Sequence, residues 1–356
     1  MRVGQFSVDD FRLPSPTFMA TSNQPPVTPE RLMQFGFAFA PPLVIGAAVK
    51  NKVFESLLGG AKTVEQVRSK TGASVRGLRA IMNALVGLEL LAKNGDKYSL
   101  VPESKAFLVG DKPDSLAGFF EMTATHILPH WLQLDDAVKT GRPPVPVNQE
   151  APGSKFFALL VENIIPINYP GALTLGEHLK LAQSRNKVRV LDIAAGSGIW
   201  GIALAQQSPN VEITAQDWPE MIATTKRIVR KFGLSDRFSY IEGDVLKADF
   251  GSGYDVATLG HILHSEGAER SRKLLKKTFN ALKSGGTIAI GEWLVNDERT
   301  EPLAGLMFAI NMLVHSEQGD TFSFNEIKSW LEEAGFKNAR TVEAPGPSPL
   351  VLATKP

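Results

Sequence analysis

One segment decides the fold: VRVLDIAAGSGIWG, residues 188–201. Its apolar first half predicts a buried parallel strand, and Ile199–Gln207 behind it predicts a helix. The small residues between them let backbone N–H groups approach a ligand, and the start of the helix adds partial positive charge. A strand, a glycine-rich turn and a helix in this order predict a nucleotide-binding site.

Two kinds of nucleotide fit this turn. The spacing of Gly196, Gly198 and Gly201 is that of NAD- or FAD-binding turns. Asp192, at the mouth of the strand, favours S-adenosylmethionine (SAM) instead. A carboxylate there repels a pyrophosphate, whereas SAM has no phosphate and carries an ammonium and a sulfonium. The alternative for Asp192 is a residue that caps or shapes the turn.

Composition limits the function further. The 356 residues predict two domains, and 38 basic against 37 acidic residues imply no broad surface for a polyanion. The absence of cysteine excludes disulfides, thiolate metal sites and cysteine nucleophiles. We find no signal-peptide core and no unbroken run of 18 apolar residues, so we expect a cytoplasmic protein without a membrane span. The apolar residues 35–49 suit a buried or subunit-contact helix.

The N-terminal third has the pattern of a winged helix. We expect an extended arm over residues 1–28 and a domain over 29–112. Within it, residues 63–67 and 74–90 predict helices, and 91–100 predict a hairpin with Asn94-Gly95 as its turn. The second helix carries only Arg76 and Arg79 as basic residues, too few for reading DNA. We therefore expect dimerisation and no nucleic acid.

Residues 113–184 predict a helical region beside the nucleotide domain. Two helices are expected, over 115–139 and 154–181, separated by a proline-rich loop over 141–153. Aromatic residues at helical spacing are typical of a core, but some of these helices adjoin the nucleotide site. We assign three side chains to a substrate pocket and one to the cofactor: His126, Trp131 and Asn163, and Tyr169.

Residues 185–356 predict the SAM-binding domain, an α/β doubly wound sheet of seven mostly parallel strands, Rossmann-like. After the first strand, further strands are expected at 211–216, 238–243, 254–259 and 287–292. A late pair at 339–342 and 350–354 is typical of methyltransferase sheets. Asp192, Asp217 and Asp244 follow three successive strands, so their carboxylates should meet in one crevice. Asp217, 21 residues after Gly196, suits a ribose, and Asp244 suits an adenine amino group.

From about residue 28 to the C-terminus the chain resembles class I SAM-dependent methyltransferases, in particular the small-molecule O-methyltransferases of the plant caffeate O-methyltransferase type and their bacterial relatives. The resemblance rests on VLDIAAGSG (190–198), DWP (217–219), GDVL (243–246), ILH (262–264), GGTIAIGE (285–292) and EAGF (333–336). The N-terminal winged-helix dimerisation domain of that family matches as well, which implies a homodimer.

The resemblance implies a role for each matching residue. His264 would be the general base, and Glu292 the carboxylate that orients its ring. SAM would be bound by Ala194 and Gly196 (methionine part), Asp217 (ribose), and Trp218, Asp244 and Val245 (adenine). The acceptor pocket would include Phe308, Asn311, Met312 and Ser316. No metal is implied, and S-adenosylhomocysteine would be the product.

Five positions depart from the family. Ala194 and Ala195 replace glycines, which is tolerable if φ stays negative. Gly260 stands where a lysine near the adenine is common, Ser265 replaces an acid after the base, and Thr321 replaces a second orienting glutamate. These losses leave open a methyltransferase-fold enzyme that uses SAM for cyclisation, decarboxylation or hydroxylation. Methylation at nitrogen or carbon also stays open. His261, three residues before His264, is the alternative for the functional imidazole. Helices rich in Met and Phe predict a small aromatic or polyketide-like acceptor.

Overall fold

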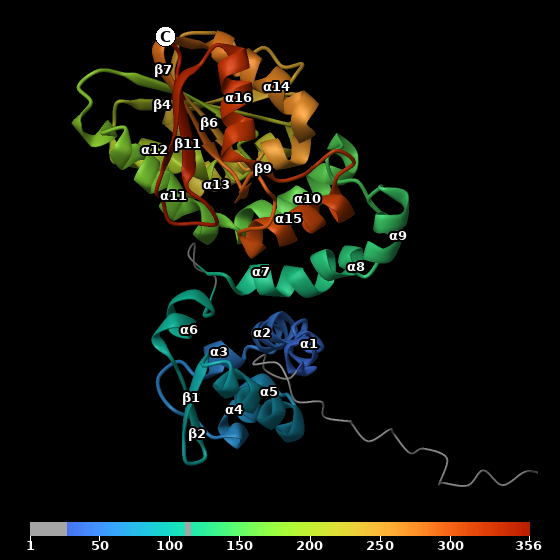
Figure 1. Ribbon diagram of the computed structural model, residues 1–356. Coiled ribbons are helices and arrows are strands. Elements are labelled where there is room, and N and C mark those ends of the chain that lie inside the picture. Colours follow the sequence, from blue (N-terminus) through green and yellow to red (C-terminus); the bar gives the residue numbers. More distant parts are fainter. Residues whose placement is uncertain (1–26, 111–114) are drawn as a thin grey trace, which may run out of the picture. The chain divides into compact units, whose positions relative to one another are not determined.

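The computed structural model describes residues 27–110 and 115–356 (Figure 1). The chain divides into two units, Met1–Ala40 and Pro41–Pro356. Most of the expected N-terminal arm, residues 1–26, lies outside the described residues. The described part of the first unit contains α1 (Glu30–Phe35), none of whose residues is buried.

The stretch around α1 is unusually apolar. Glu30–Lys50 is long and apolar enough to cross a membrane. Its most apolar 18 residues have a mean hydropathy of 1.7, and 17% of them are buried. Gln34, Pro41 and Pro42 interrupt the apolar run, which is why the criterion of an unbroken run overlooked it. The exposed side chains lie near the N-terminus: Leu32, Met33, Phe35, Phe37 and Phe39.

The winged-helix pattern is present in the second unit. It comprises α2 (Ala40–Lys50), α3 (Val53–Ser56), α4 (Val64–Thr71), α5 (Val75–Gly87), β1 (Leu91–Asn94), β2 (Lys97–Leu100) and α6 (Pro102–Phe107). Thr63 caps α4 in a capping box with Gln66, and Ser74 caps α5. Asn94 pairs with Lys97, so the hairpin turn is Gly95-Asp96 and not Asn94-Gly95. Tyr98 packs into the core of this part.

The two long helices expected next are each broken. The first becomes α7 (Ala117–Met122), the π-helical segment η2 (Thr123–Ile127), α8 (Leu128–Trp131) and α9 (Leu134–Thr140). The second becomes α10 (Glu150–Asn163) and α11 (Ile165–His178), followed by η3 (Leu181–Gln183). Pro129 and Pro166 each lie at the start of a new helix, because proline cannot donate the backbone hydrogen bond of a helix interior. The intervening loop is shorter than expected, since α10 begins at Glu150.

The seven-stranded sheet has the order β10-β11-β7-β6-β3-β4-β5 (Figure 1). Its strands are β3 (Val188–Ile193), β4 (Val211–Asp217), β5 (Phe238–Glu242), β6 (Tyr254–Gly260), β7 (Leu282–Gly291), β10 (Lys337–Val342) and β11 (Leu350–Thr354). Strands β3 to β7 are parallel, and β11 runs antiparallel to β7 and to β10. This confirms the expected methyltransferase sheet.

Helices cover both faces of the sheet. Along β3, Val190 packs with α11 and α12 (Ile199–Gln207), whereas Leu191 packs with α14 (Leu263–Ala281) and α16 (Phe324–Ala334). This alternation is the period of two of a strand buried on both faces. The remaining elements are α13 (Pro219–Lys231), η4 (Ser235–Arg237), α15 (Leu303–His315), and β8 (Leu294–Val295) paired with β9 (Phe322–Ser323). From β3 the chain continues to β4 on one side of it, and later returns to β6 on its other side. Ligands of such sheets bind where the strand order reverses, so we place the binding crevice at the carboxyl ends of β3, β4 and β6.

Candidate active site

The glycine-rich turn after β3 is built from left-handed backbone. Ala194, Gly196 and Gly198 have φ values of 51°, 55° and 74°. The condition under which an alanine at 194 is free of strain, a negative φ, is therefore not met, and this residue carries the strain of a Cβ in the left-handed region. A Cβ at Gly196 would lie 3.0 Å from Val161, and one at Gly198 would lie 2.9 Å from Thr225. The turn thus presents backbone, which is what a nucleotide site requires.

Asp217 fixes this turn from the end of β4. Its Oδ2 accepts a hydrogen bond from the Gly196 N–H at 2.7 Å, and its Oδ1 accepts one from the Trp218 N–H at 2.7 Å. Burial raises the pKa of the Asp217 carboxyl to about 6, although both N–H donors act in the opposite direction. Each oxygen retains acceptor capacity for a ribose hydroxyl. The carboxylate and the small residues of the turn together fit the SAM predicted from the sequence.

Asp192 does not line the crevice with Asp217. It is 1% exposed, and its two oxygens accept hydrogen bonds from the Gly201 N–H at 3.1 Å and the Thr258 hydroxyl at 2.7 Å. Burial raises its pKa to about 7. The structure corrects the expected charge contact with the cofactor, because the carboxylate ties the start of α12 to β6. The alternative of a turn-shaping residue describes it better.

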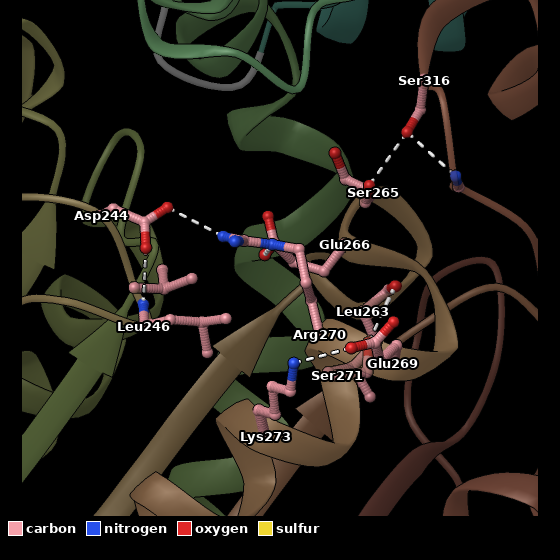
Figure 2. A network of polar contacts seen from close by, with 12 residues as sticks. Asp244, Leu246, Leu263, Ser265, Glu266, Glu269, Arg270, Ser271, Lys273 and Ser316 are labelled. Atoms are coloured by element: carbon pink, nitrogen blue, oxygen red, sulfur yellow. Dashed lines mark hydrogen bonds and ion pairs between the residues drawn. The ribbon is translucent and has the colours of Figure 1, made fainter. Parts of the chain in front are cut away.

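Asp244 belongs to a charged network at the end of β5 (Figure 2). Its Oδ1 accepts from the Leu246 N–H at 2.9 Å, and its Oδ2 accepts from Arg270 at 2.8 Å. The Nε of Arg270 also donates to Glu266 at 2.5 Å. Burial opposes the charge of Asp244, but the Leu246 N–H and the Arg270 guanidinium outweigh it and lower the pKa. Arg270 therefore links the expected adenine side to the segment that carries His264. The sequence analysis missed it, although Glu266 and Arg270 have the spacing of a helical ion pair.

Trp200 explains the glycine at position 260. A Cβ at Gly260 would lie 2.1 Å from the Trp200 Nε1, and one at Gly291 would lie 2.8 Å from the same ring. The indole therefore leaves no room for a side chain at position 260. Its Nε1 is buried without a hydrogen-bond partner among the described residues.

The expected base and its partner carboxylate meet. The Nδ1 of His264 lies 2.7 Å from the Glu292 Oε2, and the His264 N–H donates to the Oε1 at 3.2 Å. Burial opposes the charge of Glu292, but the adjacent His264 lowers its pKa, so it is ionised. A carboxylate can only accept, which assigns the ring proton to Nδ1 and leaves Nε2 as a proton acceptor.

His261 is a second imidazole beside this pair. The rings of His261 and His264 are 6.2 Å apart, and burial lowers the pKa of His261 to about 4, so it is neutral. One ligand atom from each of His261, His264 and Glu292 lies within 4.8 Å of the others, a spacing that could hold a metal ion. In this structure the Nδ1 of His264 and the Oε2 of Glu292 are joined by a direct hydrogen bond.

Backbone carbonyls supply a second support for His264. Gly267 (φ 73°, ψ 171°) breaks α14 and frees the carbonyls before it. The Asp320 N–H donates to the His264 carbonyl at 2.9 Å, and the Ser316 hydroxyl donates to the Ser265 carbonyl at 2.9 Å (Figure 2). We call residues 316–320 the carbonyl clamp. Ser316 thus serves this clamp, and its expected place in the substrate pocket is corrected.

Neither residue expected near the missing second glutamate replaces it. The hydroxyl of Thr321 is buried without a partner among the described residues. The carboxylate of Asp320 lies 3.3 Å from Arg299. The second support of His264 is therefore made by backbone groups rather than by a carboxylate.

Two aromatic rings and an amide extend from the base. The Phe308 ring meets the His264 ring edge-on at 4.9 Å and stacks on Trp293 at 4.5 Å. The Trp131 indole donates to the Asn311 side chain at 3.0 Å, which joins α8 to α15. Met312 is buried on α15. The structure joins Trp131 to Asn311 and Phe308 to His264, whereas the stacking of Trp293 on Phe308 was not foreseen.

Three other residues predicted for the pocket or the cofactor have protein partners in this structure. His126 is exposed and bonds Thr125 on its own helix at 2.8 Å. Asn163 donates to the Leu159 carbonyl at 2.9 Å and packs on Gly118. Tyr169 bonds Gln206, at the far end of α12 from the glycine-rich turn, which argues against its expected cofactor contact. In each case the polar group has a partner within the helical layer.

The remaining cofactor candidates flank the crevice. Trp218 caps the start of α13, and its ring lies 6.3 Å from the Phe157 ring. Val245 is buried just after Asp244. Both positions suit the edges of an adenine site between β4 and β5.

Geometry of this kind, a SAM-type turn with a paired imidazole at the mouth of a seven-stranded sheet, defines a class I methyltransferase. Residues 131–337 match the O-methyltransferase domain family, and residues 33–110 match the O-methyltransferase dimerisation domain. The chain belongs to this O-methyltransferase family and is a SAM-dependent O-methyltransferase.

Three similar proteins illustrate the family. The chain is 28% identical to a 3-hydroxy-5-methyl-1-naphthoate 3-O-methyltransferase of Streptomyces sahachiroi, over 87% of this chain and 90% of that one. It is 27% identical to the tetracenomycin polyketide synthesis 8-O-methyl transferase of Streptomyces glaucescens, over 92% and 97%. Human N-acetylserotonin methyltransferase in complex with SAM has the same fold, with a TM-score of 0.79, 24% identity, and coverage of 94% of this chain and 99% of that one.

Proposed function

We propose that this enzyme methylates a hydroxyl group of a small aromatic, polyketide-like acceptor, with His264 as general base. The observation that carries the proposal is the buried His264–Glu292 pair at 2.7 Å, with the Phe308 ring against the imidazole. The compounds after which the two Streptomyces relatives are named, a naphthoate and tetracenomycin, support an aromatic acceptor. Methyl transfer is favoured over the other uses of SAM because the base keeps its carboxylate.

The cofactor would lie along the carboxyl ends of β3, β4 and β5. The turn at 194–198 would bind the methionine part, Asp217 the ribose, and Trp218, Asp244 and Val245 the adenine. When bound, SAM supplies an electrophilic methyl group on a sulfonium.

The chain's own residues would handle the proton. A phenol has a pKa near 10, so at neutral pH the hydroxyl is mostly protonated. The Nε2 of His264 would accept that proton as the oxygen becomes a nucleophile, a contribution of about 10²–10⁴ in rate. Glu292 fixes the ring by its bond to Nδ1 and would stabilise the imidazolium that forms. Phe308 and Trp293 would hold an aromatic acceptor and exclude water beside the base.

We also propose a homodimer formed through the N-terminal domain, in a cytoplasmic enzyme that needs neither metal, nucleic acid nor membrane. Support comes from the match of residues 33–110 to a dimerisation domain and from the exposed Phe35, Phe37 and Phe39. On this reading residues 29–112 dimerise, 113–184 contribute to the pocket, and 185–356 bind the cofactor.

Replacement of the base tests the mechanism. With labelled SAM and 2-naphthol as acceptor, His264→Ala should lower kcat by about 10²–10⁴. The Kd for S-adenosylhomocysteine, measured by calorimetry, should stay unchanged, since no cofactor contact is lost. A His178→Gln variant on the exposed end of α11 is the matched control. Full activity of His264→Ala, or methylation of 2-naphthol at carbon only, would refute the proposed chemistry.

A further inference from the structure

A second pair of imidazoles lies beyond the catalytic one. His130 on α8 and His315 on α15 have ring centroids 4.7 Å apart, and Phe156 on α10 packs against both, at 6.4 and 5.4 Å. The Nδ1 of His130 and the Nε2 of His315 are buried, and neither has a hydrogen-bond partner among the described residues. Folded proteins leave few buried polar atoms unpaired, so this pair is built to meet a polar group.

The hydrogen-bond pattern defines which group fits. The Nδ1 of His315 lies 2.8 Å from the Asn311 carbonyl, which can only accept, so Nδ1 carries the proton and Nε2 is an acceptor. Burial lowers the pKa of His315 to about 4 and also lowers that of His130, so both rings are neutral at pH 7. His130 can present Nδ1–H as a donor. A hydroxyl would donate to His315 and accept from His130, whereas a carbonyl or carboxylate satisfies His130 alone.

The position of the pair relates it to the reacting hydroxyl. Phe308, Asn311 and His315 share one face of α15, at helical spacing i, i+3 and i+7. Phe308 contacts His264 at one end of this stripe, and seven residues of helix separate its Cα from that of His315 by about 10 Å. This separation is on the scale of a fused aromatic ring system.

We propose that His130 and His315 form a second hydroxyl-binding subsite of the acceptor pocket. It binds a hydroxyl on the ring remote from the one that is methylated, and so selects fused-ring diols over simple phenols. This inference rests on the proposed function, because it assumes that the acceptor lies between His264 and α15. A water molecule held permanently between the two rings is the competing occupant.

Binding of two matched probes tests the subsite. Calorimetry would compare 2,7-dihydroxynaphthalene with 2-naphthol on the full-length enzyme saturated with S-adenosylhomocysteine. We expect the diol to bind about 10-fold more tightly in the wild type, which corresponds to about 1.4 kcal/mol for the added hydrogen bonds. His315→Phe and, separately, His130→Phe should abolish this ratio while leaving the Kd of 2-naphthol within about twofold. His178→Gln should keep the ratio.

Two outcomes overturn the proposal. Equal affinity for both probes in the wild type, as a permanent water would give, removes the subsite without reference to any variant. A ratio that survives in His315→Phe, with an unchanged melting temperature, assigns the preference elsewhere. Failure of the proposed function has a separate signature: 2-naphthol would bind but would not be methylated when SAM is supplied.

Discussion

At the scale of single residues, burial raises the pKa of two carboxyl groups beside the glycine-rich turn, Asp192 and Asp217. The raised pKa of Asp192 shows this most directly, since the group is 1% exposed. The ordinary pKa of an aspartate is 3.8, and that of Asp192 in the folded protein is about 7. Between these two pH values the folded protein keeps a proton on Asp192 that the unfolded chain has released. The free energy of unfolding therefore falls as the pH rises through this window.

Asp192→Asn should remove that dependence. The asparagine oxygen can accept from Gly201, and its amide can donate to Thr258, so the two contacts remain possible. Relative to wild type, the unfolding free energy of the variant should increase from pH 4 to pH 7, by up to about 1.4 kcal/mol per pH unit. Urea unfolding at several pH values measures it. Parallel pH curves for the two proteins would show that Asp192 does not titrate in this range.

A second residue-scale prediction concerns Gly260 and Trp200. Gly260→Ala should destabilise the protein by about 1–3 kcal/mol, because the added Cβ would lie 2.1 Å from the indole Nε1. Trp200→Phe should relieve the clash, so the double variant should be more stable than the sum of the single changes predicts. Thermal unfolding of the four proteins gives this coupling, and strict additivity would contradict it.

At the scale of elements, the sequence predicted what local patterns control. The strands of the seven-stranded sheet, the helices α4 and α5, and the meeting of His264 with Glu292 follow from periodicity and a family motif. Prolines indicate the breaks only in part, because new helices begin around Pro129 and Pro166 whereas Pro170 lies inside α11. The burial of Asp192 and the carbonyl clamp could not be predicted, because both depend on which segments meet in three dimensions.

The carbonyl clamp makes an element-scale prediction. Ser316→Ala removes the bond to the Ser265 carbonyl, at 2.9 Å, and loosens the segment that carries His264. We expect kcat to fall by about 3- to 10-fold, on the scale of one hydrogen bond, with KM nearly unchanged. Ser184→Ala, which removes a hydroxyl that donates to the Asn186 carbonyl at 2.9 Å, is the matched control. The pH profile of kcat should also shift, whereas a purely structural role would lower only the melting temperature.

At the scale of the whole molecule, the exposed apolar side chains of the N-terminal stretch can be buried in two ways. Exposed Phe35, Phe37 and Phe39 would be buried by a second subunit or by a lipid surface. Residues 33–110 match a dimerisation domain, which favours the second subunit. A membrane helix would have to place Gln34, Pro41 and Pro42 in the hydrocarbon, at a cost in unsatisfied backbone groups.

Replacing all three phenylalanines by serine should therefore convert a dimer into a monomer. Analytical ultracentrifugation would show the change in mass, and Leu132→Ser, an exposed leucine on the described part of the second unit, should leave the dimer intact. Vesicle flotation distinguishes a lipid surface from a second subunit. If the segment binds lipid, the wild type will float with the vesicles and the triple variant will remain at the bottom of the gradient. A wild type that is monomeric in solution and floats with vesicles would refute the dimer and assign this stretch to a membrane.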